Sequence, residues 1–115
     1  MIRADLHVHT CLSPCAEILS SPRKIARAAL SRSLDIVGIC DHNSAENARA
    51  VAEAAGRLGI RALPGLEITS REEVHVLALF DDLDAALRLQ ERVYDALPGE
   101  NDPDVFGLQV VADAE

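Results

Sequence analysis

The chain has 115 residues, a length that fits one small domain, and 49% of the residues are hydrophobic. With 26% charged residues as well, this composition excludes a disordered, collagenous or low-complexity chain. Nineteen Asp and Glu residues outweigh eleven Lys and Arg residues, so the net charge of −8 offers no general attraction for duplex nucleic acid or an anionic membrane. No apolar stretch approaches the roughly 20 residues of a bilayer span. Without a recognisable export signal, we expect a cytoplasmic protein.

The first elements are a strand and a helix. Apolar and polar residues alternate over Ile2–His9, which predicts a strand with Asp5, His7 and His9 on one face. A loop follows, and Ser21-Pro22 then provides a capping hydroxyl and a proline suited to the first turn of a helix. We expect that helix to run to about residue 33.

The middle of the chain repeats this order. Leu34–Cys40 is a nearly continuous apolar run, typical of a strand buried on both faces of a parallel sheet. An alanine-rich helix is expected over residues 45 to about 58. Ile60–Leu63 then reads as a short strand, after which Pro64-Gly65 is expected to bend the chain.

The last predicted elements are a strand over Val74–Phe80 and a helix over Asp82–Leu97. Residues 98–103 have turn chemistry, and Phe106–Val111 is compatible with one more strand before an acidic end. Strands that alternate with helices predict an α/β fold with mostly parallel strands.

All four histidines lie on or at the ends of predicted strands. His7 and His9 are two residues apart, so their side chains leave the same strand face about 7 Å apart at the backbone. His42 and Glu67 end two further strands, and His75 lies early in a fourth. A single strand histidine is more often a hydrogen-bonded core residue, but the carboxyl ends of parallel strands converge on one rim. Imidazole with carboxylate suits Zn²⁺, Fe²⁺ or Mn²⁺, so the set predicts a metal site.

Other polar residues near these histidines have secondary roles. Asp5 and Asp41 could accept backbone N–H groups at the strand ends or orient neighbouring imidazoles, and we expect the second role for both. The three cysteines are an odd number, which indicates reduced thiols. Cys40 lies inside an apolar run and is expected to be a small buried hydrophobe. Cys11 and Cys15 follow the histidine pair in a loop, where either could bind metal, react with oxidants or do neither.

Several of these segments together resemble one family. Asp5–Thr10 (DLHVHT), Leu34–Asn43 (LDIVGICDHN) and Gly65–Ile68 (GLEI), followed by His75, resemble the PHP (polymerase and histidinol phosphatase) domain in order and spacing. The resemblance covers residues 2–80. It implies a distorted (βα)7 TIM-like barrel whose strand ends hold up to three divalent metal ions, with Zn, Mn and Fe as candidates.

The resemblance also implies a ligand set. The metal ligands carried over from the family are His7, His9, His42, Glu67 and His75, with Glu67 as the bridge between two ions. The family places one further ligand in the loop after His-x-His. An ungapped match puts it at Cys15, and a gapped match puts it at Glu17.

The family's second half normally supplies further histidines, but this chain has none after His75. We therefore expect one truncated PHP domain over residues 1–115, forming a partial barrel.

The implied function is a metal-dependent phosphoesterase that hydrolyses a phosphate ester by metal-activated water and is incomplete in this chain. The expected substrate is a small phosphorylated molecule or nucleotide. The alternatives are a non-catalytic metal-binding or structural PHP module and a half-barrel that forms a homo-oligomer through its open sheet edge.

Overall fold

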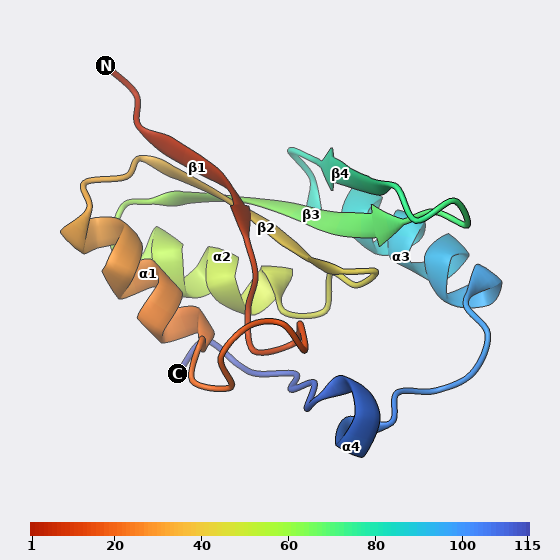
Figure 1. Cartoon of the computed structure of the whole chain (residues 1–115). Coiled ribbons are helices and arrows are strands. Elements are labelled where there is room, and N and C mark those ends of the chain that lie inside the picture. The colour runs from red at the N-terminus through yellow and green to blue at the C-terminus, as the bar shows by residue number, and fades with distance from the viewer.

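The computed structural model describes residues 1–115, and its centre is one four-stranded sheet (Figure 1). The strands lie in the order β1-β2-β3-β4. β1 pairs with β2 and β2 pairs with β3 in parallel, whereas β3 and β4 are antiparallel. Their bounds are β1 Ala4–Val8, β2 Ile36–His42, β3 Arg61–Thr69 and β4 His75–Leu79.

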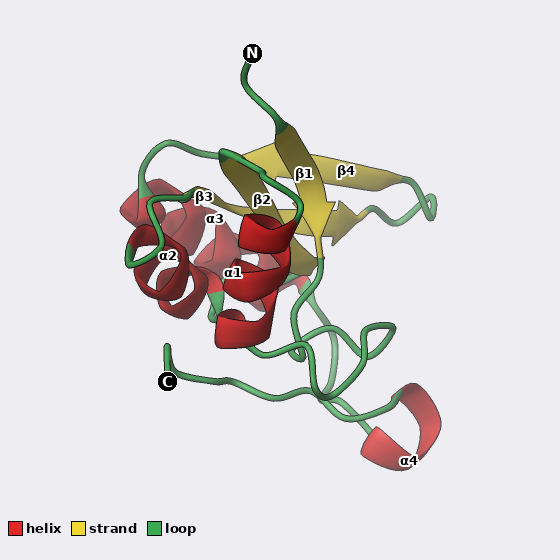
Figure 2. Ribbon diagram, turned by 90° about the vertical axis from the view of Figure 1, so that its left-hand side faces the viewer, coloured by secondary structure: helices red, strands yellow, loops and turns green.

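The three longer helices all lie on one side of this sheet, and α4 lies apart from it (Figure 2). The opposite face of the sheet has no helix on it. None of the helices is both long and apolar enough to cross a membrane. Their bounds are α1 Pro22–Ser31, α2 Ala48–Gly56, α3 Leu83–Ala96 and α4 Pro103–Phe106.

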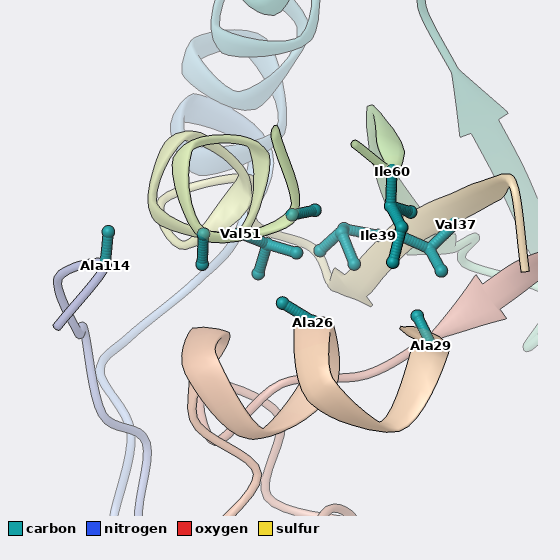
Figure 3. Close-up of a cluster of buried hydrophobic side chains, with 9 residues drawn as sticks. Ala26, Ala29, Val37, Ile39, Val51, Ile60 and Ala114 are labelled. Carbon is teal, nitrogen blue, oxygen red and sulfur yellow. The ribbon is translucent and has the colours of Figure 1, made fainter. Parts of the chain in front are cut away.

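The main core lies between the sheet and helices α1 and α2 (Figure 3). Val37 and Ile39 of β2 meet Ala26 of α1 and Val51 of α2, and all four are almost fully buried. A smaller cluster around Leu66 of β3 packs under α3. Successive strand residues point to opposite faces. Residues that alternate with this core, such as Glu67, therefore face the side without helices.

The predicted bend at Pro64-Gly65 is wrong, because β3 continues through both residues to Thr69. The Pro64 carbonyl accepts a hydrogen bond from the Phe80 N–H at 2.9 Å, at the end of the β3–β4 ladder. Proline has no backbone N–H, but at this position the sheet loses little stability from the missing hydrogen bond. At Gly65 a Cβ would collide with the Ala78 carbonyl. This glycine therefore permits close strand pairing, whereas the sequence pattern suggested a turn.

The further strand over Phe106–Val111 is also absent. Residues 103–106 form the short helix α4, capped by the Asp102 carboxylate, and the chain then runs extended without joining the sheet. Its Val110 N–H donates to the Cys11 carbonyl at 3.0 Å, so the segment pairs with the loop after β1. The other elements lie within a few residues of their predicted bounds, and the sheet is mixed α/β with mostly parallel strands.

Candidate metal centre

The four histidines, which come from three segments, meet Glu67 of β3 at one end of the sheet. His42 and Glu67 are paired residues at the carboxyl ends of β2 and β3, next to His7 and His9 at the end of β1. His75 begins its strand, but β4 is antiparallel to β3, so its first residue pairs with Thr69 at the same rim. Because β4 runs antiparallel to β3, His75 at the start of β4 lies beside the residues at the end of β3.

Glu67 is the centre of this cluster. Its Oε2 atom lies 2.9 Å from Nε2 of His7, 2.9 Å from Nε2 of His9 and 3.7 Å from Nδ1 of His42. Its Oε1 atom lies 2.8 Å from Nδ1 of His75. One carboxylate therefore faces all four imidazoles of the chain.

The surroundings of Glu67 keep it ionised. The side chain is only 7% exposed, and burial by itself would raise its pKa. Hydrogen bonds with His7 and His75 and the nearby charge of His42 outweigh burial and lower the pKa to about 2. Burial lowers the pKa of His9, with a further contribution from His42, so His9 favours its neutral, lone-pair-bearing form. An ionised carboxylate and a neutral imidazole are the forms that bind metal ions.

The spacing of these donor atoms fits a metal ion. Nε2 of His7, Nε2 of His9 and Oε2 of Glu67 are separated by 2.9 to 3.1 Å. Around a tetrahedral ion with bonds of about 2.0 Å, donors lie about 3.3 Å apart, so only a slight opening is required.

Two other groups of possible metal ligands share residues with the group formed by His7, His9 and Glu67. His42, Glu67 and His75 form one, and His9, Cys15 and His42 form the other. The structure therefore brings all six predicted ligand residues into three groups that share members.

A buried hydrogen-bond network orients His9. The Ser13 hydroxyl lies 2.9 Å from Nδ1 of His9 and 2.7 Å from Oδ1 of Asp41, and it accepts from the His42 N–H at 3.0 Å. Asp41 is fully buried and only accepts hydrogen bonds when ionised, so the single Ser13 proton goes to this carboxylate. The Ser13 oxygen then accepts from Nδ1–H of His9, which leaves the Nε2 lone pair facing the cluster.

Thr10 completes this network. Its N–H and its hydroxyl donate to the two oxygens of Asp41, at 2.6 and 2.7 Å, and its hydroxyl accepts from the Asn47 side chain at 2.9 Å. Sequence reasoning missed Ser13, Thr10 and Asn47, since small polar residues in a loop look like ordinary turn residues. The one available signal was the presence of two hydroxyls within four residues of His9.

Asp41 and Asp5 differ in whether they are linked to an imidazole. Asp41 reaches His9 only through Ser13. Asp5 accepts from the backbone N–H of His7 at 3.2 Å and bonds no imidazole, so its expected role is wrong.

The cysteines separate into buried and exposed thiols. Cys40 is fully buried, as expected, and burial with the nearby Glu67 and Asp41 charges raises its pKa to about 11. Cys11 is also buried and its thiol points to the Val110 carbonyl, which removes it from the candidate ligands. Cys15 is exposed and lies in a group with His9 and His42, whereas Glu17 is in none of the groups.

The PHP domain family model matches residues 5–99, so this chain belongs to the PHP domain family. Among curated proteins it is 27% identical over 101 residues to an uncharacterized protein of Methanocaldococcus jannaschii. That match covers 80% of this chain and 59% of the relative, so the chain spans less than two thirds of the relative's length.

Two solved structures have a similar fold. One, from Bifidobacterium adolescentis, is described as a "putative metal-dependent phosphoesterase" and matches with a TM-score of 0.65 at 28% identity. The other, an amidohydrolase from Chromobacterium violaceum with bound sulfate and no metal, matches with a TM-score of 0.67 at 28% identity. The matches cover 82% and 81% of this chain but 32% of each neighbour. Both neighbours support the fold, since a mixed four-stranded α/β sheet is consistent with part of a TIM-like barrel.

Proposed function

We propose that this chain is the metal-binding part of a PHP-type, metal-dependent phosphoesterase acting on a small phosphorylated substrate. The observation that carries the proposal is the Glu67 carboxylate, which faces the imidazoles of all four histidines. The phosphoesterase description of a structural neighbour at 28% identity supports the reaction class. The proposed ligands are His7, His9, Cys15, His42, Glu67 and His75.

The two carboxylate oxygens of Glu67 divide the ligands. Oε2 faces His7 and His9, and Oε1 faces His75, which supports Glu67 as the ligand that two ions would share. Bound Zn²⁺, Mn²⁺ or Fe²⁺ would acidify water and neutralise charge on the phosphate oxygens.

The proposed reaction takes no nucleophile from the protein. Ser13 keeps the Nε2 lone pair of His9 directed at the cluster. Cys11 and Cys40 are buried, with pKa values raised by burial, so neither thiol is placed to attack a phosphate ester. Water is therefore the proposed attacking group, and the ester oxygen leaves as the alcohol.

We also propose that the sheet is part of a distorted (βα)7 barrel and that residues 1–115 form one domain. The helices cover one face of the sheet, as they cover the outside of a barrel, and the cluster lies at the carboxyl ends of the parallel strands, where barrel sites form. Since this chain matches 32% of each neighbour, we expect weak activity from it alone.

The test is release of inorganic phosphate from methyl phosphate and benzyl phosphate by protein loaded with Mn²⁺ or Zn²⁺. Glu67→Gln should lower turnover at least a hundredfold, because it removes the shared ligand charge. Glu17→Gln is the matched control and should leave turnover unchanged, since Glu17 is exposed and outside the cluster. Equal activity in the two variants would refute the proposal.

A further inference from the structure

A cleft of about 930 Å³ adjoins the candidate metal centre and shares His42 and Cys15 with it. Its volume is within the range of small-molecule sites. We call it the side cleft. If the phosphoryl group of a phosphate ester lay on these two shared residues, the alcohol portion of the ester would lie in the side cleft.

One wall of the side cleft is apolar and exposed. Leu97, Phe106 and Val111 line it with 42%, 64% and 59% of their surface exposed. Side chains of this size expose apolar surface that a ligand could cover. They come from the segment after α3, which contributes nothing to the metal cluster.

The Val111 end of this wall is fixed to the protein interior. The buried Asn47 donates to the Val110 carbonyl at 2.9 Å and accepts from the Ala112 N–H at 2.9 Å. Ala114 is buried in the main core. Residues 110–114 are therefore anchored by two backbone hydrogen bonds and by the buried Ala114 side chain.

The polar groups of the side cleft are mostly uncharged. The side-chain Oδ1 of Asn43 accepts from the Thr69 N–H, but the side-chain NH₂ group of Asn43 bonds no other residue, and neither does the Gln109 side chain. No Lys or Arg lines the cleft, and Glu46 is its only carboxylate. In a chain with a net charge of −8, a second anionic group on the ligand would meet repulsion without a cationic partner.

We propose that the side cleft binds the uncharged, partly apolar alcohol portion of a phosphate monoester. This inference rests on the proposed function and narrows its substrate class. It favours monoesters with a hydroxyl or amide next to an apolar or aromatic group, and it disfavours nucleotides with additional phosphates and oligonucleotide ends.

The test compares benzyl phosphate with 4-carboxybenzyl phosphate on the metal-loaded protein. The two esters share the same reacting carbon–oxygen–phosphorus unit and differ by one remote negative charge. We expect kcat/KM for benzyl phosphate to be about tenfold higher. Equal kcat/KM values would overturn the inference.

Two variants of cleft residues and one control variant locate the effect. Phe106→Ala should lower kcat/KM for benzyl phosphate about fivefold, through KM, and leave methyl phosphate unchanged, because only the larger ester reaches the ring. Val105→Ala is the matched control, since Val105 is 68% exposed but does not line the cleft. Gln109→Lys should reverse the preference towards 4-carboxybenzyl phosphate. Loss of the same size in both alanine variants would overturn the inference.

Binding of benzylphosphonate, which is not hydrolysed, separates this inference from the proposed function. Calorimetry on metal-loaded protein should show tighter binding than for methylphosphonate, and Phe106→Ala should abolish the difference. That result without any ester turnover would support the cleft and refute the phosphoesterase. Turnover of methyl phosphate with equal phosphonate affinities would support the phosphoesterase and refute the cleft.

Discussion

The Ser13 hydroxyl orients the His9 imidazole in the candidate metal centre. Its hydroxyl joins Nδ1 of His9 to the buried Asp41 and also accepts from the backbone of His42. Ser13→Ala leaves Asp41 with one donor fewer and His9 without a fixed tautomer. We expect metal affinity to fall about tenfold to a hundredfold, measured by calorimetric titration with Zn²⁺.

The matched control is Ser20→Ala, because the Ser20 hydroxyl makes no hydrogen bond in the structure. If Ser13→Ala bound Zn²⁺ as tightly as this control, the orienting role of Ser13 would be wrong.

Glu67 makes the metal-free protein sensitive to acid. Its pKa is lowered to about 2 in the folded state, below the ordinary value of about 4.3. A lowered carboxyl pKa stabilises the fold above the unfolded pKa, and this stabilisation is lost as pH falls from about 5 towards 2. We expect the free energy of unfolding to fall by about 2 kcal/mol over that range, measured by urea denaturation. Glu67→Gln should flatten this dependence, and an unchanged slope would contradict the argument.

At the scale of elements, hydrophobic patterning predicted four strands and three long helices because each has a continuous apolar stripe or run. It failed at Pro64-Gly65, where local turn chemistry was outweighed by pairing on both sides of β3. It also failed at Phe106–Val111, where Phe106 and Val111 line the side cleft and the segment does not extend the sheet. Both errors arose where tertiary partners decide the conformation, and one sequence does not show partners.

The close pairing at Gly65 can be tested directly. Gly65→Ala would push a Cβ against the Ala78 carbonyl, so we expect it to lower the free energy of unfolding by about 1–3 kcal/mol. Gly56→Ala is the control, because it lies in α2 with open space around it and should be neutral or slightly stabilising. Chemical denaturation of both variants measures the difference. Equal stabilities would show that β3 and β4 are not packed this closely.

At the scale of the whole molecule, β1 and β4 are open edges of the sheet. Open edges and the exposed Val76 on β4 favour self-association as a second property of this chain. Light scattering should give a mass that rises with concentration. Val76→Lys should keep the chain monomeric, whereas Val105→Lys, away from the sheet, should not. A monomeric wild type at all concentrations would contradict this prediction.

The ligand residues of the candidate metal centre could be predicted from the sequence, but their supporting hydrogen bonds could not. Strand-end positions and the family motifs selected all six residues that the fold groups together. The hydrogen bonds from Asp41 through Ser13 to His9 were beyond sequence, because they depend on a loop conformation that no periodic pattern encodes. The side cleft was equally hidden, since it joins residues from the two ends of the chain.

The most direct test of the central claim is metal content per chain, measured by elemental analysis on untagged protein dialysed against Zn²⁺ or Mn²⁺ and then against metal-free buffer. We expect at least about one ion retained per chain, and loss of that ion in His9→Ala with the circular dichroism spectrum unchanged. Wild-type protein that retains no ion would contradict the account, because the strand ends would then not form a metal centre.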